Sequence, residues 1–217
     1  LHDERARHLR SVLKVVPGQS IRVGIVDGPL GTGCVASASD DGVLLDCAFE
    51  ATAPERPPVD LILALPRPKV LRRLWAQLSA LGVGRVLLAN AERVERQYFD
   101  THLLDEAVYR PLLIEGLQQA RDTRLPRVTI HRRFRPFIED ELEALCPDTA
   151  RVVADPASDT RVTAALAGIG ARRIVLAVGP EGGWNGFELD LLAAHGFARV
   201  GLGPRTLRSD TACTALL

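Results

Sequence analysis

The 217-residue sequence contains no methionine, and aromatic residues make up only 5% of it. It also has no excess of either charge, because 27 basic residues balance 27 acidic ones, so net charge does not point to a nucleic-acid partner. No apolar run approaches the ~20 residues that a membrane-spanning helix needs. Since the chain starts at Leu1 without methionine and a helical pattern still runs at Leu217, we expect both ends to be trimmed.

The four cysteines have neither CxxC spacing nor clustered histidines, which argues against a metal site. We therefore expect buried thiols, a reducing cytoplasmic compartment and no bound metal. The sequence also lacks a nucleophile elbow, HExxH, the GK[ST] of a P-loop and a GxGxxG after its first strand. These absences argue against hydrolysis by a triad or zinc, and against a nucleoside triphosphate or dinucleotide ligand. The cysteines are Cys34, Cys47, Cys146 and Cys213.

The first 57 residues differ in character from the rest. A helical charge pattern over residues 2–13 is followed by short β-rich runs that Asp-Gly turns separate, and such turns are hairpin signals. The proline-rich segment 50–58 cannot carry a regular ladder and predicts a linker. We therefore predict a small β-barrel domain with its linker over residues 1–57, and a second domain over residues 58–217.

Strand-like and helix-like segments alternate in the second domain, a rhythm typical of an α/β fold with a parallel sheet. In the longest predicted helix, the expected apolar face consists of Leu103, Leu104, Ala107, Val108 and Leu112. The predicted strands cover residues 59–65, 85–89, 127–130, 151–154, 174–178 and 198–202. The predicted helices cover residues 69–81, 101–121, 136–145, 158–166 and a segment from 186.

Two glycine-bearing turns each follow a predicted strand near the C-terminus: GPEGG from Gly179 and GPRTLR from Gly203. Glycines let a ligand approach main-chain groups at the carboxyl ends of parallel strands, so the pair predicts a site for a flat heterocycle. A single turn of this kind is also an ordinary strand-to-helix connection. Because the Glu181 carboxylate would repel phosphate, it favours a ligand with hydroxyls or a positive centre, such as S-adenosylmethionine.

Basic residues gather in two places. Between residues 121 and 135, six arginines and one histidine face the single acid Asp122, which fits contact with a phosphate backbone. The alternative is a solvated loop balanced by the acidic residues 139–143. Four basic residues on the first helix form either a basic edge or a solvated face. The two sets are Arg121, Arg124, Arg127, Arg132, Arg133 and Arg135, and Arg5, Arg7, Arg10 and Lys14.

The C-terminal motifs carry a resemblance to a known family. GPEGGW from Gly179, LGPRTLRSDTA from Leu202 and their spacing resemble the signature of the RsmE family, the 16S ribosomal RNA uridine N3-methyltransferases of the SPOUT class. HLRSVLK from His8 and ALGV from Ala80 are similar to further motifs of that family. The resemblance implies a PUA-like N-terminal β-barrel, an S-adenosylmethionine-dependent α/β domain with a deep trefoil knot, a 16S ribosomal RNA substrate and a homodimer.

The resemblance also implies roles for single residues. Glu181 would lie near the ribose hydroxyls or the sulfonium, and Arg208 would face the target base or a phosphate. Each has a structural alternative, since either residue can simply serve the start of a helix. The implied cofactor-binding residues are Ala154, Gly179, Glu181, Gly182, Leu202, Gly203 and Leu207. The catalytic candidates are Arg208 and Glu181, and the RNA-binding candidates are Arg10, Lys14, Arg121, Arg124 and Arg205.

The chain departs from the family pattern in two places. Gln77 and Ala80 stand where a lysine and a glutamate are usual, and QQARD from Gln118 to Asp122 replaces an acid-Gln-Ser-Gly-Arg turn. Because the cofactor loops keep their pattern, we expect methyl transfer, whereas the target uridine stays open. The alternatives are an RNA-binding relative without catalysis, and a methyltransferase that acts on a different RNA site.

Overall fold

The computed structural model describes residues 1–168, 170, 173–203 and 205–217. The chain forms two compact units. The first combines Leu1–Glu55 with Arg121–Arg124, and the second combines Arg56–Ala120 with Leu125–Leu217. Hydrogen bonds explain why the short later segment joins the first unit, because the Thr123 hydroxyl donates to the Gly28 carbonyl oxygen at 2.6 Å.

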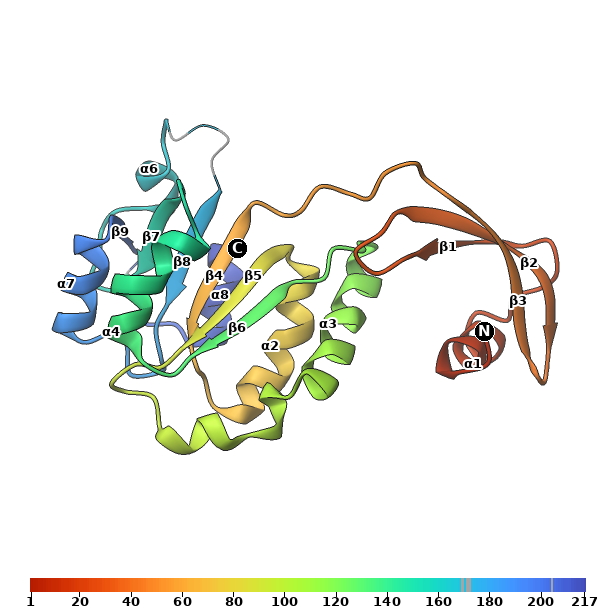
Figure 1. Ribbon diagram of the computed structural model, residues 1–217, viewed down its shortest axis with the longest axis horizontal. Helices are drawn as coiled ribbons and strands as arrows, with labels where there is room; N and C mark the ends of the chain where they lie inside the picture. The colour runs from red at the N-terminus through yellow and green to blue at the C-terminus, as the bar shows by residue number, and fades with distance from the viewer. Residues whose placement is uncertain (169, 171–172, 204) are drawn as a thin grey trace. The chain divides into compact units, whose positions relative to one another are not determined.

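The first unit contains one helix and a three-stranded antiparallel sheet of order β1-β2-β3 (Figure 1). The elements are α1 (Glu4–Ser11), β1 (Ser20–Gly24), β2 (Leu30–Ser39) and β3 (Gly42–Phe49). The Asp3 carboxylate accepts a hydrogen bond from the Arg5 amide and so caps α1. The predicted helix and hairpins are confirmed, whereas a closed barrel stays a prediction.

The second unit is built on six parallel strands in the order β6-β5-β4-β8-β7-β9. Two consecutive halves of the chain, β4 to β6 and β7 to β9, meet where β4 pairs with β8. Both central strands are buried on both faces, which is why their sequences are nearly continuous apolar runs. The predicted parallel sheet is therefore confirmed. Its strands are β4 (Val59–Ala64), β5 (Val83–Ala89), β6 (Arg127–His131), β7 (Ala150–Ala154), β8 (Ile174–Val178) and β9 (Phe197–Val200).

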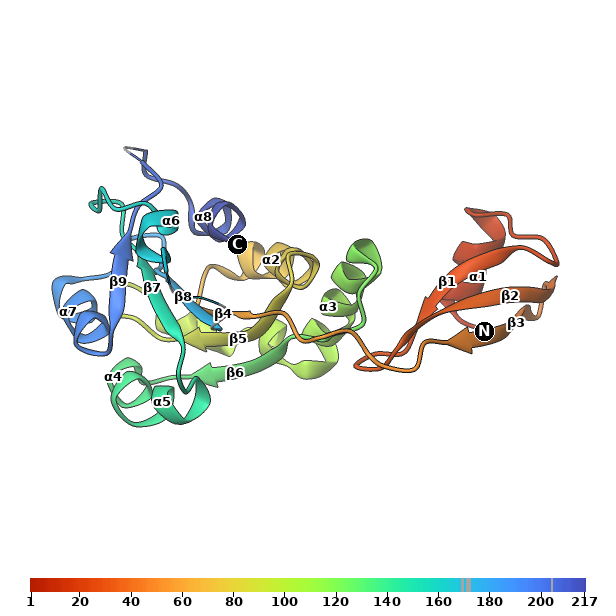
Figure 2. The ribbon, with the colours of Figure 1, turned by 90° about the horizontal axis from the view of Figure 1, so that it is seen from above.

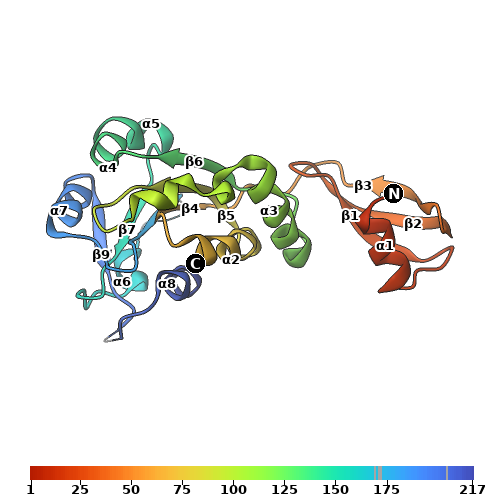
Figure 3. The ribbon, with the colours of Figure 1, turned by 90° about the horizontal axis from the view of Figure 1, so that it is seen from below.

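Helices cover both faces of this sheet (Figures 2 and 3). Helices α2 and α8 lie together on one face, where Arg73 and Asp210 form an ion pair of 2.8 Å, and α4 and α5 lie on the other. The longer helices are α2 (Pro68–Ala80), α3 (Glu106–Ala120), α7 (Gly186–Ala194) and α8 (Ser209–Leu216). The shorter ones are α4 (Phe134–Pro136), α5 (Leu142–Leu145), α6 (Val162–Ala165), the 3-10 turns η1 (Arg96–Asp100) and η2 (His102–Leu104), and the π-helical turn η3 (Phe137–Glu141).

Two predicted helices are wrong in extent. The helix predicted over 101–121 begins only at Glu106, because the preceding residues form the turns η1 and η2. The helix predicted over 158–166 shrinks to α6, because the segment before it is extended and hydrogen-bonded to the chain that leaves β9.

The predicted apolar face is right for four of its five residues, because Leu103 is buried and Leu104, Val108 and Leu112 are partly buried against the core. Helix α3 also packs against α2. Its buried residues are Leu113, Gly116 and Leu117, whereas Ala107 is exposed. A Cβ atom at Gly116 would lie 2.1 Å from the carbonyl oxygen of Ala76, so the two helices approach backbone to backbone. A search for large apolar side chains cannot detect a packing face whose centre is a glycine.

The cysteine prediction is half right. Cys146 and Cys213 are buried, and burial raises the pKa of the Cys213 thiol to about 12. Cys34 and Cys47 are exposed, which contradicts the prediction. The small core of the first unit does not reach either position, since it is formed by Ala6, Leu9, Val15, Val35 and Val43.

His131, at the end of β6, is expected to make the stability of the second unit sensitive to pH. Its buried ring stacks on Phe137 at 3.9 Å between centroids, and its nitrogens lie 2.8 Å from the Thr129 hydroxyl and 2.9 Å from the Glu141 carboxylate. Burial lowers the pKa of His131, an effect that Glu141 partly opposes. An unfolded histidine titrates near 6.5, so the unfolded state binds more protons below that pH.

The free energy of unfolding is therefore expected to fall as the pH drops below about 6.5, through the lower pKa of the folded state. Urea unfolding at about pH 7.5, 6.5 and 5.5 measures this loss. The variant His131→Gln should show a smaller change over the same interval. A wild-type protein that gains stability on acidification would contradict this prediction.

Candidate active site

The carboxyl ends of all six strands share one edge of the sheet, because the strands are parallel. Both glycine turns lie at this carboxyl edge, one after β8 and the other after β9, with β7 between the two strands. In α/β sheets, ligands bind at this edge. Of the residues in these two turns, Pro204 lies outside the described residues.

A cleft lies beside the second turn, between the ends of β7 and β9 and the helix α8. It brings together four predicted cofactor-binding residues, Ala154, Leu202, Gly203 and Leu207, together with the predicted RNA contact Arg205. Its volume is about 50 Å³, so it must widen to enclose a ligand of cofactor size. The remaining lining residues are Asp155, Pro156, Val200, Gly201, Ala212 and Leu216.

The chemistry of the cleft fits an adenosyl group. Leu207, Ala212 and Leu216 give it apolar walls that suit a flat heterocycle. Among the described residues, the backbone amides of Leu202 and Gly203 make no hydrogen bond, so both can donate to a ligand. Apolar walls with a few polar groups of this kind are typical of a cofactor site.

A close crossing of two segments closes one side of the cleft. The Gly201 amide donates to the Thr160 carbonyl oxygen at 2.8 Å, and the Ser158 hydroxyl donates to the Arg199 carbonyl oxygen at 3.0 Å. A Cβ atom at Gly201 would lie 2.0 Å from the Ser158 carbonyl oxygen. Only glycine fits this crossing, so Gly201 is a site residue that the sequence analysis did not single out.

The first turn contacts the loops after β4 and β5. The Glu181 carboxylate accepts a hydrogen bond from the Arg67 amide at 3.3 Å, just before α2, and the Gly182 carbonyl oxygen accepts one from the Arg93 guanidinium. None of the predicted residues Gly179, Glu181 and Gly182 is among those that line the cleft. The structure therefore brings together one part of the predicted cofactor site and leaves these three beside it.

The Trp184 side chain packs against the first glycine turn. It is buried, and a Cβ atom at Gly179 would lie 3.1 Å from its ring, whose centroid is 5.3 Å from that of Phe134. The next residues form a capping box, in which Asn185 and Glu188 cap α7 reciprocally. The Asn-x-x-Glu spacing made this box visible in the sequence, whereas no sequence signal indicated that the indole would pack on the glycine.

Exposed arginines follow four of the six strands at the carboxyl edge. Only some of them stand out in the sequence, because the others are scattered along the chain and only the parallel sheet brings their loops to one edge. Acidic residues between β5 and α3 lower the positive charge of this edge; they are Glu92, Glu95, Asp100 and Asp105. The arginines are Arg67 after β4, Arg93 and Arg96 after β5, Arg132 and Arg133 after β6, and Arg205 and Arg208 after β9.

The other four predicted RNA contacts all lie in the first unit. The Arg10 guanidinium donates to the carbonyl oxygen of Asp40 at 2.7 Å and to its carboxylate at 2.8 Å. Arg124 donates to the carbonyl oxygens of Pro54 and Asp27. Lys14 and Arg121 are exposed and have positive φ angles of 49° and 57°.

Within the described ranges, no group of three or more His, Cys, Asp or Glu side chains is arranged to hold a metal ion. A search of the same residues for a helix long and apolar enough to cross a membrane finds none.

Comparison with known proteins identifies the family. The model of the RNA methyltransferase domain matches residues 54–217. Ribosomal RNA small subunit methyltransferase E of Treponema pallidum is 32% identical over 98% of this chain and 80% of its own length. Ribosomal RNA small subunit methyltransferase E 1 of Borreliella burgdorferi is 23% identical over 99% of this chain and 88% of its own.

A solved structure shows the same fold. The crystal structure of ribosomal RNA small subunit methyltransferase E from Neisseria gonorrhoeae, bound to S-adenosyl methionine, matches with a TM-score of 0.78. The sequence identity is 22%, and the match covers 99% of this chain and 87% of that one. By the family model and the relative from Treponema pallidum, the chain belongs to the RNA methyltransferase family that includes the ribosomal RNA small subunit methyltransferases E.

Proposed function

We propose that this protein is an S-adenosylmethionine-dependent methyltransferase that acts on N3 of a uridine in 16S ribosomal RNA. Family membership supports RNA methyl transfer, and the names of the relatives support the small-subunit ribosomal RNA. The observation that carries the proposal is the cleft at the carboxyl edge, where Ala154 meets Leu202, Gly203 and Leu207, which come from a segment more than forty positions later.

The cofactor would be held by main-chain groups and apolar walls. Leu202 and Gly203 offer amides that make no hydrogen bond to any described residue, and Leu207 offers a wall for the adenine. On the β8 side, we assign Gly179, Gly182 and Glu181 to the same ligand, with the Glu181 carboxylate near its hydroxyls or its positive centre. When bound, S-adenosylmethionine supplies an electrophilic methyl group.

Arg208 is our candidate for the catalytic residue. It lies immediately before α8, is exposed and makes no side-chain cap to that helix. Uracil N3 must lose its proton before it can act as a nucleophile, and the loss leaves an anion. A guanidinium placed beside that anion stabilises it electrostatically, while Arg205, on the same loop after β9, orients the RNA phosphates.

We further infer the finer fold and assembly that the family resemblance implies. A trefoil knot is supported by the crossing at Gly201, where residues 158–161 pair with the chain that leaves β9. The antiparallel sheet of the first unit supports a PUA-like RNA-binding domain, with Arg10, Lys14, Arg121 and Arg124 as its proposed contacts. The assembly would be a homodimer in the cytoplasm.

Calorimetry with S-adenosylmethionine and S-adenosylhomocysteine is the first test, and mass spectrometry of 16S ribosomal RNA from cells with and without the gene is the second. We expect cofactor binding and a methyl group on N3 of one uridine. Absence of cofactor binding would reject the proposal, and a modification on another nucleotide would reject its target.

The variant Arg208→Ala is expected to lower kcat by about 100-fold, the usual cost of removing one electrostatic stabiliser, and to leave cofactor affinity unchanged. Arg135→Ala is the control, because Arg135 is paired with Glu139 at 2.9 Å and should affect neither quantity. An equal loss of kcat in both variants, or no loss in either, would show that Arg208 is not a catalytic residue.

A further inference from the structure

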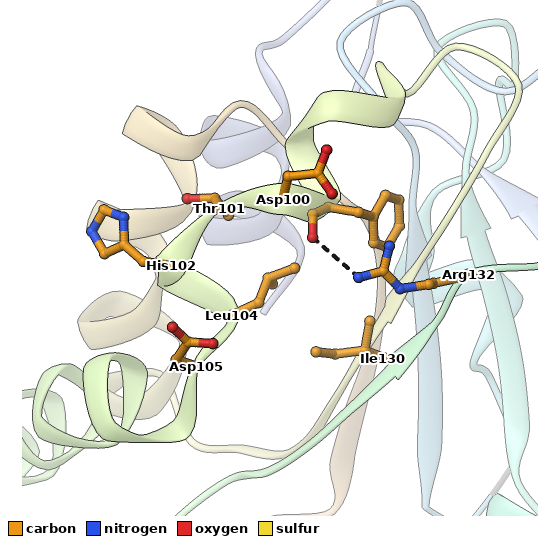
Figure 4. Close-up of a pocket in the computed structure, with 8 residues that line it drawn as sticks. Asp100, Thr101, His102, Leu104, Asp105, Ile130 and Arg132 are labelled. Carbon is orange, nitrogen blue, oxygen red and sulfur yellow. Dashed lines mark hydrogen bonds between the residues drawn. The ribbon is translucent and has the colours of Figure 1, made fainter.

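A second cavity, about 490 Å³ in volume, lies between the segment from Phe99 to Asp105 and the edge strand β6 (Figure 4). Its size falls within the range of about 300–1,000 Å³ that is usual for small-ligand sites. It is separate from the cofactor cleft, because β6 and β9 lie at opposite ends of the sheet. The proposed function assigns it no role.

The cavity has aliphatic side chains along its sides and charged side chains at its ends. Leu104 and Ile130 approach it from its two sides, and Ile130 is 39% exposed although it is aliphatic. Arg132 and Asp105 lie at opposite ends, and Asp100 lies near the rim (Figure 4). The aliphatic walls suit the faces of a flat ring, and the charged ends suit polar groups on its edges.

The charged groups are available to a ligand. Neither carboxylate, Asp100 or Asp105, has a hydrogen bond or ion pair with any other described residue. Arg132 donates one N–H to the Phe99 carbonyl oxygen at 3.1 Å, and its guanidinium lies 5.1 Å from the centroid of the Phe99 ring. These contacts fix the arginine at the cavity wall while its remaining N–H groups can still donate.

A guanine base matches this arrangement. Its N1–H and N2–H groups form two adjacent donors, which one carboxylate accepts together, and its O6 and N7 atoms form two adjacent acceptors, which an arginine satisfies together. Adenine, cytosine and uracil each lack one of these paired edges. A phosphate is disfavoured, since two carboxylates would repel it.

We propose that this cavity binds a guanine base of the RNA substrate, with Asp105 on the Watson–Crick edge, Arg132 on O6 and N7, and the ring between Leu104 and Ile130. The proposal rests on the proposed function. Arg132 directly follows β6, so the cavity opens at the carboxyl edge, as the cofactor cleft does. Five strand spacings separate β6 from β9, roughly 24 Å, so the guanine would lie several nucleotides from the methylated base.

Fluorescence anisotropy with short labelled oligonucleotides tests this proposal on the full chain. Each probe is a uridine nonamer whose central base is guanine, hypoxanthine (inosine, without the N2 amine), 7-deazaguanine or adenine. We expect the guanine probe to bind about 10-fold more tightly than the inosine, 7-deazaguanine or adenine probe.

The variant Asp105→Asn should abolish discrimination between guanine and inosine. The variant Arg132→Gln should abolish discrimination between guanine and 7-deazaguanine. Asp140→Asn, at an exposed acid of η3, is the matched control and should retain both.

Equal affinity for the four probes, or unchanged discrimination in Asp105→Asn, would overturn the proposal. So would a change of oligomeric state in Asp105→Asn without a change in base discrimination, since the cavity would then belong to a contact between copies of the chain. Calorimetry with S-adenosylmethionine on the same samples separates the two proposals. Normal cofactor binding without base discrimination rejects only the guanine site, whereas base discrimination without cofactor binding rejects only the methyltransferase.

Discussion

The variant Gly201→Ala is expected to bind S-adenosylmethionine at least about 100-fold more weakly than the wild type and to lose about 1–3 kcal/mol of unfolding free energy. The added methyl group would lie 2.0 Å from the Ser158 carbonyl oxygen and 3.4 Å from that of Asp155. Both are backbone atoms, so no side-chain rotation relieves the clash. The segments must separate, and the cleft between β7 and β9 changes shape with them.

Calorimetry measures the cofactor affinity of this variant, and urea unfolding measures its stability. Gly186→Ala is the matched control, because a Cβ atom at Gly186 meets nothing within 4 Å. That substitution should change the unfolding free energy by less than about 0.5 kcal/mol and leave cofactor affinity intact. Wild-type affinity in Gly201→Ala would show that the crossing does not shape the cofactor site.

The second large effect is expected for Asp60→Ala, which should lower the unfolding free energy by about 3–5 kcal/mol. Asp60 is fully buried on the central strand β4, and its carboxylate binds Arg85 at 2.9 Å and Arg173 at 2.7 Å. Removing the carboxylate leaves two partly buried guanidinium groups without their shared partner. Both arginines keep some contact with water, so we expect the lower end of this range.

Urea unfolding compares this variant with Asp190→Ala. Asp190 forms an exposed pair with Arg199 at 3.1 Å, and such surface pairs contribute less than about 1 kcal/mol. Similar losses in the two variants would mean that burial of the Asp60 carboxylate does not govern the strength of its ion pairs.

Much of the second unit could be predicted from its sequence, because buried parallel strands are apolar on both faces and so produce runs such as Leu61–Leu65. The order of the strands in the sheet could not be predicted from the sequence. Pairing of β4 with β8 joins residues that are more than a hundred positions apart, and neither strand contains a mark that specifies its neighbour. The extended segment before α6 was also mistaken for helix, since its partner is the backbone at Gly201 rather than a side-chain pattern.

For the site, sequence reasoning succeeded where the glycines themselves mark the turn, as in Leu202 and Gly203 beside the cleft. It did not find Gly201, whose role depends on a carbonyl oxygen more than forty positions earlier. Nor did it find the guanine cavity, because Asp105 and Arg132 come from separate segments that only the fold brings together.

The departures from the family pattern lie at the edge of the sheet opposite the cleft. Helix α2 begins after the carboxyl end of β4 and ends just before β5 begins, so Gln77 and Ala80 lie near the amino edge. Gln118, at the end of α3, lies near the start of β6 for the same reason. These replacements therefore bear on recognition away from the cofactor, and they give no reason to expect loss of methyl transfer.

The meeting of β4 with β8 has a consequence for synthesis of the chain. The ribosome releases β4, β5 and β6 long before β8. Asp60 cannot form its ion pair with Arg173 until that residue, 113 positions later, has been synthesised. During that interval, one edge of an apolar central strand has no partner, and such an edge favours aggregation. Folding of the second unit should thus be slow, with a nascent half-sheet that relies on chaperones until its other half emerges.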